Sequence, residues 1–210
     1  MNHIVLLGDS VFDNKAYVGT EPDVTAHLKR IIPDGWEVTL RAVDGSLVRA
    51  VVQQFATIPA DASHLVVSVG GNDALMNADV LNMPVSSSAE FLSVLSERIA
   101  EFEESYKEML SSVVTLGLPV AVSTIYYPNF ADRQLQRIAV VALSSFNDVI
   151  IRQAAVNKIP ILDLRLICNE PDDYANEIEP SGKGGAKIAA AIKRLIDLHS
   201  FLRPISAIYY

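Results

Sequence analysis

The sequence has one cysteine, few basic residues and no long apolar run, and each shortage excludes a class of protein. Cys168 stands alone among 210 residues, so the chain forms neither an internal disulfide nor a Cys-x-x-Cys metal or redox site, which fits a reducing cytoplasm. The 17 Lys and Arg residues are scattered among 25 Asp and Glu, which argues against a nucleic-acid partner. No stretch approaches the roughly 18 apolar residues of a membrane span, and residues 1–7 lack the features of an export signal. We therefore expect a cytoplasmic protein with no membrane partner.

Apolar residues are abundant, at 50% of the chain, and they fall into short runs that alternate with helical patterns. A parallel sheet buried on both faces accounts for this composition. Strands are predicted at His3–Leu7, Trp36–Arg41, His64–Val69, Val120–Thr124 and Pro160–Leu164, and helices at Asp23–Ile32, Ser46–Phe55, Ala89–Leu116, Asp132–Val156 and Gly184–Leu202. The alternation predicts one α/β domain over residues 1–210, a flavodoxin-like three-layer sandwich with a five-stranded parallel sheet.

Short polar motifs follow the first three predicted strands. Gly8-Asp9-Ser10 follows the first, Val43-Asp44-Gly45-Ser46 the second and Gly70-Gly71-Asn72-Asp73 the third. Taken singly, these are ordinary turn and helix-cap residues. At successive strand ends they gain weight, because open α/β sheets bind ligands at the carboxyl ends of their strands.

Together with Pro180-Ser181-Gly182-Lys183-Gly184 before the last helix, these motifs resemble the SGNH (GDSL) hydrolase family over nearly the whole chain. The resemblance implies acyl transfer with Ser10 as the nucleophile. The amides of Ser10 and Gly45 and the Asn72 side chain would donate to the oxyanion of the transition state. Asp9 and Asp73 would brace the turns that carry the motifs.

The chain departs from the family at its last motif, Asp-x-x-His-Pro, where it has Asn176-Glu177-Ile178-Glu179-Pro180. Glu179 thus stands in place of the histidine base, and Asn176 in place of the aspartate that orients it. A solvated glutamate, with a pKa of about 4.3, is a poor base at neutral pH. Burial would raise the pKa of Glu179 and make it a base, whereas exposure at a helix start would lower it. Both interpretations stay open.

No other residue is an evident substitute for the missing base. The histidines fall at the amino ends of predicted strands or within predicted helices, away from the motifs: His3, His27, His64 and His199. Asp163, near the end of the fifth strand, and Asp172 or Asp173 beyond it are candidates for a second carboxylate.

Two segments are candidates for the walls of a substrate pocket. Ala74–Ser88 is long for a connection in such a fold and includes Met76, while Tyr126 and Tyr127 follow the fourth strand. Neither a metal nor an organic cofactor is implied, since no metal-binding or phosphate-binding motif is in place.

The predicted function is a serine esterase that acts on small carboxylic esters or acylated sugars through Ser10, with Glu179 as an altered base. A homo-oligomer is compatible with the sequence. The first alternative is a weak or inactive relative that binds an acylated or carbohydrate ligand. The second is a flavodoxin-like cofactor binder, for which the sequence offers no phosphate cradle.

Overall fold

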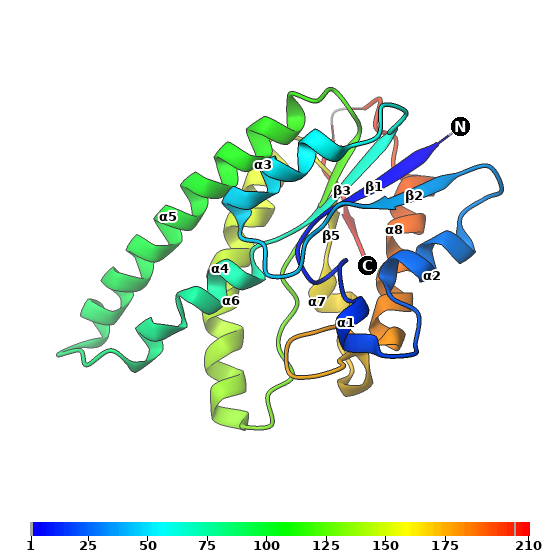
Figure 1. Cartoon of the computed structure of the whole chain (residues 1–210). Coiled ribbons are helices and arrows are strands. Elements are labelled where there is room, and N and C mark those ends of the chain that lie inside the picture. Colours follow the sequence, from blue (N-terminus) through cyan, green and yellow to red (C-terminus); the bar gives the residue numbers. More distant parts are fainter. Residues whose placement is uncertain (1, 204) are drawn as a thin grey trace.

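A parallel sheet forms the middle layer of the computed structural model, which describes residues 2–203 and 205–210 (Figure 1). Its strands run in the order β2-β1-β3-β4-β5-β6, and every neighbouring pair is parallel. The strands are β1 His3–Gly8, β2 Glu37–Leu40, β3 His64–Ser68, β4 Val120–Ser123, β5 Ile161–Leu162 and β6 Ile208–Tyr209. The flavodoxin-like α/β architecture predicted from the sequence is confirmed.

Helices cover both faces of the sheet: α1 Lys15–Val18, α2 Val24–Ile31, α3 Val51–Gln54, α4 Gly71–Met76, α5 Ser88–Val114, α6 Arg133–Val156, α7 Leu164–Ile167 and α8 Gly182–Leu198. Successive side chains of β1 point to opposite faces, as the period of a strand requires. Ile4 and Leu6 pack in the core beneath α2 and α8, and Val5 and Leu7 in the core beneath α3, α5 and α6 (Figure 1).

Of the described helices, α6 is the one long and apolar enough to cross a membrane, judged by length and composition alone. Its residues Phe146, Val149 and Ile150 are buried against the sheet together with side chains of α5. These contacts are those of a core helix.

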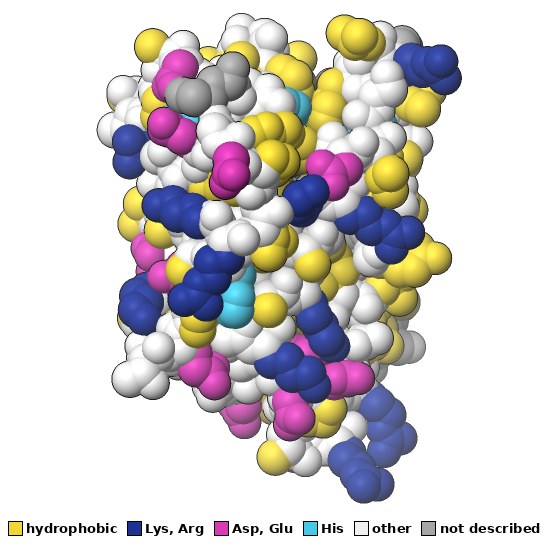
Figure 2. All heavy atoms as spheres, turned by 90° about the vertical axis from the view of Figure 1, so that its right-hand side faces the viewer, with side chains coloured by type: hydrophobic (Ala, Val, Ile, Leu, Met, Phe, Trp, Pro, Cys, Tyr) yellow, Lys and Arg dark blue, Asp and Glu magenta, His cyan; other side chains and the backbone are white. Residues whose placement is uncertain are grey.

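The face over α2 and α8 carries charges of both signs. Figure 2 shows Lys and Arg side chains interspersed there with Asp, Glu and uncharged groups, and they do not gather into one basic patch. This agrees with the scattered distribution of basic residues along the sequence.

One sequence prediction needs correction. The sheet has six strands and not five, because Ile208 and Tyr209 pair with Ile161 and Leu162 of β5. A strand of two residues leaves no periodic pattern in the sequence. The long connection Ala74–Ser88 is partly helical, since it begins within α4 and includes the 3₁₀ helix η3, Ala78–Asn82.

Candidate active site

The site lies at the point of the sheet where the strand order reverses, between the carboxyl ends of β1 and β3. Gly8 ends β1 with φ +123°, and a Cβ there would stand 1.8 Å from the carbonyl oxygen of Ser68 at the end of β3. Only glycine fits so close an approach. The next residue, Asp9, donates its backbone N–H to the same carbonyl at 3.1 Å. The two strand ends are thereby joined directly beneath Ser10.

Gln54, in α3, fastens the end of β1 from a second side. Its Oε1 accepts from the Gly8 N–H, and its Nε2 donates to the Gly8 carbonyl, both at 2.8 Å. The side chain is buried, so this pair of hydrogen bonds is shielded from water. Sequence reasoning missed Gln54, because a glutamine inside a helical pattern carries no signal that it will contact a distant strand end.

Ser10 and Glu179 meet at this edge of the sheet although they lie far apart in the sequence. The Ser10 Oγ donates a hydrogen bond to the Glu179 Oε1 at 3.1 Å. Each residue is only 7% exposed. The structure therefore places a carboxylate within proton-transfer reach of the serine hydroxyl.

The backbone around Glu179 is held by two asparagines. The Asn176 Oδ1 accepts from the N–H groups of Ile178 and Glu179, both at 2.9 Å, and so closes a tight turn. The fully buried Asn14 donates its Nδ2 to the Pro180 carbonyl at 3.1 Å. Asn176 thus positions the backbone of this turn, a use of its side chain different from orienting a base.

Burial sets the proton affinity of this carboxyl. It raises the pKa of Glu179 to about 7, against the opposing hydrogen bond from Ser10, and the nearby charge of Asp44 adds to the rise. The second oxygen, Oε2, is buried with no hydrogen-bond partner among the described residues. Of the two interpretations left open by the sequence, this environment agrees with a buried carboxyl of raised pKa.

Asp9 is a second buried carboxyl at the same place. Burial, together with the charges of Glu179 and Asp73, raises the pKa of Asp9 to about 8, although its Oδ1 accepts from the Val11 N–H at 3.1 Å. The carboxyl is therefore mostly protonated at pH 7. This leaves Glu179 as the readier of the two to ionise.

The expected oxyanion donors differ in whether they reach the cavity. Asn72 lines the cavity beside Ser10, and its Nδ2 donates to the Ser46 carbonyl at 3.1 Å. Gly45 lies in the exposed loop after β2 and does not line the cavity. Asp73 accepts from the Val48 N–H at 3.0 Å and so ties the start of α4 to the residues that follow that loop.

A cavity of about 280 Å³ opens from Ser10 and Glu179 toward the space between α4, α5 and α6. Apart from a polar end at Asp9, Ser10, Asn72 and Glu179, its walls are mainly aliphatic and aromatic: Val69, Leu75, Val80, Leu81, Leu95, Ile125, Tyr126, Phe130, Leu135, Leu143 and Phe146. Such a cavity suits an apolar group held next to a polar one.

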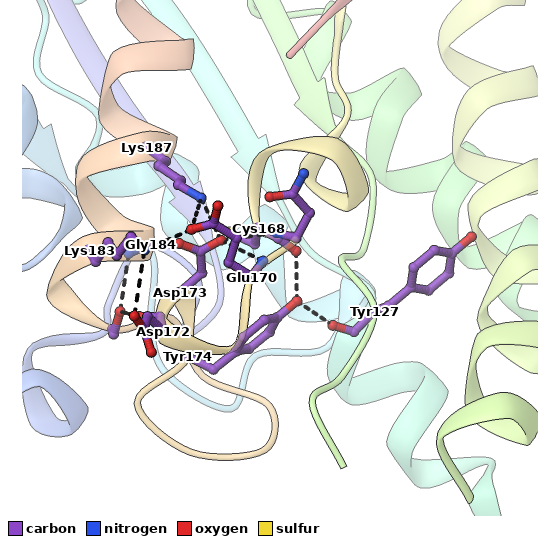
Figure 3. A network of polar contacts seen from close by, with 11 residues as sticks. Tyr127, Cys168, Glu170, Asp172, Asp173, Tyr174, Lys183, Gly184 and Lys187 are labelled. Atoms are coloured by element: carbon purple, nitrogen blue, oxygen red, sulfur yellow. Dashed lines mark hydrogen bonds and ion pairs between the residues drawn. The ribbon is translucent and has the colours of Figure 1, made fainter. Parts of the chain in front are cut away.

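Of the three side chains expected to wall the pocket, only Tyr126 lines it. Met76 is 65% exposed at the end of α4. Tyr127 presents its carbonyl to the hydroxyl of Tyr174, at 2.6 Å, and its side chain does not line the cavity (Figure 3).

The alternative carboxylates are engaged elsewhere. Asp163 forms an ion pair with Arg165 at 2.6 Å and accepts from the Thr124 hydroxyl at 3.0 Å. Asp172 is near Lys183, at 3.7 Å, and Asp173 accepts from Lys187 at 2.8 Å (Figure 3). None of these carboxylates, and none of the four histidines, lines the described cavity.

Known proteins resemble this chain in structure, but none was found to resemble it in sequence. No protein-family model matches the chain, and no curated protein is significantly similar to it in sequence. Solved structures do match. An extracellular lipase from Streptomyces rimosus aligns over 92% of this chain and 99% of its own, with 16% identity and a TM-score of 0.66.

Two further matches have the same character. A GDSL-like lipase from Bacteroides thetaiotaomicron aligns over 93% of this chain and 87% of its own, with 17% identity and a TM-score of 0.63. A psychrotrophic esterase from Pseudoalteromonas sp. aligns over 94% of this chain and all of its own, with 12% identity and a TM-score of 0.66. The chain has the SGNH hydrolase fold. At these identities the likeness concerns the fold, and the function must be argued from the site.

Proposed function

We infer that this protein is a serine carboxylic ester hydrolase in which Ser10 is the nucleophile and Glu179 the general base. The hydrogen bond between the Ser10 Oγ and the Glu179 Oε1, 3.1 Å long, carries the inference, because it lies at the polar end of an apolar cavity. The names of the structural neighbours, lipases and esterases, support the same class of reaction.

Acylation begins when ionised Glu179 accepts the proton of Ser10 as the Oγ attacks the ester carbonyl carbon. The negative charge that forms on the carbonyl oxygen is stabilised by the Ser10 N–H and by the Asn72 side chain after it exchanges its bond to Ser46 for the oxyanion. Protonated Glu179 then gives the proton to the departing alkoxide. The alcohol leaves, and the acyl group remains on Ser10.

Deacylation repeats these steps with water. The water oxygen attacks the acyl carbon while Glu179 accepts a proton from that water. Glu179 then returns a proton to the Ser10 Oγ as the carboxylic acid departs. A base that also serves as an acid works best when its pKa is near the working pH. The pKa of Glu179, raised to about 7 by burial, meets that condition, whereas an ordinary glutamate does not.

The cavity walls favour an aliphatic acyl group over a polar one. Phe130, Leu135 and Leu143 line the part of the cavity formed by α6 and the loop before it, and Leu75 and Leu95 line it from α4 and α5. We propose that the acyl chain lies along these side chains and that the alcohol part of the ester faces the solvent.

A change in the cavity wall tests this arrangement. Phe130→Ala should lower kcat/KM for aryl esters with longer acyl chains relative to kcat/KM for the aryl acetate, a loss of discrimination of about 1–3 kcal/mol. Met76 is exposed, so Met76→Ala should leave the order of preference among acyl chains unchanged.

A fluorophosphonate probe tests the nucleophile directly, because only an activated serine reacts with it. We expect wild-type protein to be labelled at Ser10 and to hydrolyse aryl esters. Ser10→Ala should lose both properties, and Ser111→Ala, a change on the exposed side of α5, should lose neither. Activity retained in Ser10→Ala would refute the assignment.

The main alternative is a protein that has kept the cavity but not the chemistry. The Asn72 amide bonded to Ser46 and the position of Gly45 away from the cavity are the observations that favour it. In that case the wild-type protein would show neither labelling nor turnover, yet would bind fatty acids or their esters in the cavity. Calorimetric titration with a medium-chain fatty acid separates the two functions.

A further inference from the structure

A cluster of three potential ligands lies at the opposite edge of the sheet, where the strands begin. His3 is at the start of β1, Glu37 is at the start of β2, and Asp61 is in the loop before β3. The His3 ring is buried, with a side chain 5% exposed, while the Glu37 and Asp61 side chains are 56% and 62% exposed. A fixed imidazole therefore faces two carboxylates that are free to adjust.

The separations match those of ligands around one metal ion. One ligand atom from each residue, the His3 Nδ1 and a carboxylate oxygen from Glu37 and Asp61, lies within 4.8 Å of the others. The Nδ1 is 3.1 Å from Asp61 and 4.0 Å from Glu37. Ligands bound at about 2.1 Å in tetrahedral or octahedral geometry stand roughly 3.0–3.4 Å apart, so the distance from the His3 Nδ1 to Glu37 needs to shorten by less than about 1 Å, and the Glu37 side chain is exposed and free to move.

The other ring nitrogen of His3 is already held. The Nε2 lies 2.7 Å from the Thr39 hydroxyl, on β2. If Nε2 carries the ring proton and donates it to Thr39, the Nδ1 lone pair points at the two carboxylates. Histidines that bind metals are oriented in this way by a partner on the nitrogen that faces away from the ion.

We propose that His3, Glu37 and Asp61 bind one divalent transition-metal ion of the zinc and cobalt class. One imidazole and two carboxylates suit these ions, whereas magnesium and calcium prefer sets made entirely of oxygen. The ion would join β1, β2 and the loop before β3, and water would complete its coordination. Because the site lies at the far edge from Ser10, it stabilises the fold and takes no part in ester hydrolysis.

Titration of the untagged protein with Co²⁺ and Zn²⁺ tests the site. We expect one ion per chain with a dissociation constant in the micromolar range, visible absorption bands from bound Co²⁺, and a rise in Tm on addition of Zn²⁺ that Mg²⁺ does not reproduce. Asp61→Asn and Glu37→Gln should each weaken binding by at least about 10- to 100-fold, the loss typical for a residue that merely supports a ligand. Thr39→Val should weaken it within that range.

The controls separate this site from others. Asp34→Asn removes an exposed carboxylate in the turn before β2 and should leave binding unchanged. Both ligand variants keep His3, so ions held only by His3 and the neighbouring backbone would still bind to them. The proposal would be overturned if the wild-type protein bound neither Co²⁺ nor Zn²⁺, or if Asp61→Asn and Glu37→Gln bound them as well as wild type. It would also be overturned if Mg²⁺ raised the Tm as much as Zn²⁺ does. Circular dichroism verifies that each variant is folded.

Discussion

Two buried carboxylates in the segment between α7 and α8 have opposite surroundings. Asp173 is fully buried, and its Oδ2 accepts from the N–H groups of Asn169 and Glu170 and from the Lys187 ammonium, at 2.8–3.0 Å (Figure 3). Glu179 is 7% exposed, and among the described groups its carboxylate accepts a hydrogen bond only from the Ser10 hydroxyl. Burial alone therefore does not distinguish the two residues.

The difference lies in how many donors each negative charge receives. The Asp173 Oδ2 accepts three hydrogen bonds, one of them from a cation, and these bonds hold the loop, although the Oδ1 has no partner among the described residues. Glu179 has no cationic partner among the described residues, and burial raises its pKa to about 7. A carboxylate short of donors can exchange a proton near neutral pH. The first residue is suited to holding structure, the second to chemistry.

The largest expected effect is on turnover, in Glu179→Gln. The amide keeps the shape of the side chain but cannot accept the Ser10 proton, so we expect kcat/KM to fall by roughly 10³- to 10⁴-fold. In wild type, kcat/KM should rise with pH and level off above about 7, because only ionised Glu179 acts as a base. Steady-state kinetics on an aryl ester from pH 5 to about 9 measures both effects. A flat profile together with an unimpaired Glu179→Gln variant would remove the base from the mechanism.

The second-largest expected effect, also on turnover, comes from restoring the family motif. Asn176→Asp combined with Glu179→His should recover the activity lost in Glu179→Gln, because an imidazole is a base near neutral pH and the aspartate would fix its tautomer. Glu179→His alone should recover less, since an imidazole without a partner can adopt the wrong tautomer. If the wild-type protein is an inactive relative, the double variant should create activity. No gain in a folded double variant would show that the loss of activity lies elsewhere in the site or that the motif is aligned out of register.

Asp173→Asn tests the structural side of the comparison. Loss of the charge leaves Lys187 with only Glu170, at 3.4 Å, and we expect the free energy of unfolding to fall by about 1–3 kcal/mol. Turnover at a temperature where the variant is folded should stay near that of wild type. Urea titration combined with ester kinetics measures the two quantities on one sample. A large loss of turnover with unchanged stability would reverse the roles of the two carboxylates.

Asp9→Asn extends the comparison to a third buried carboxyl. Burial raises the pKa of Asp9 from 3.8 to about 8, so the folded state holds its proton over a pH range in which the unfolded chain has released it. Between these two pKa values the stability contributed by Asp9 must fall as pH rises. We expect the stability of the variant relative to wild type to be greater at pH 8 than at pH 5, by up to about 1.4 kcal/mol for each pH unit between the two pKa values. Equal differences at the two pH values would contradict the raised pKa.

The sequence predicted the parts of the molecule that local pattern determines. Ser10 and Asn72 were placed at one edge of the sheet because parallel strands end together, and they do line one cavity. The environment of Glu179 was not predictable, since its burial depends on how residues 175–181 fold over Ser10. The position of Gly45 away from the cavity depends on the path of an exposed loop. The pocket walls were also only partly foreseen, because Met76 and Tyr127 sit in the expected segments but face elsewhere.

The sixth strand has a consequence for how the protein is handled. The Ala207 and Tyr209 carbonyls accept hydrogen bonds from the N–H groups of Ile161 and Asp163, each at 2.8 Å, so β6 covers the outer edge of β5. Removal of residues 205–210 would leave those N–H groups open at an apolar edge, ready to pair with another molecule. Residues 205–210 therefore protect the protein against aggregation through the edge of β5, and a purification tag is better placed where it does not displace them.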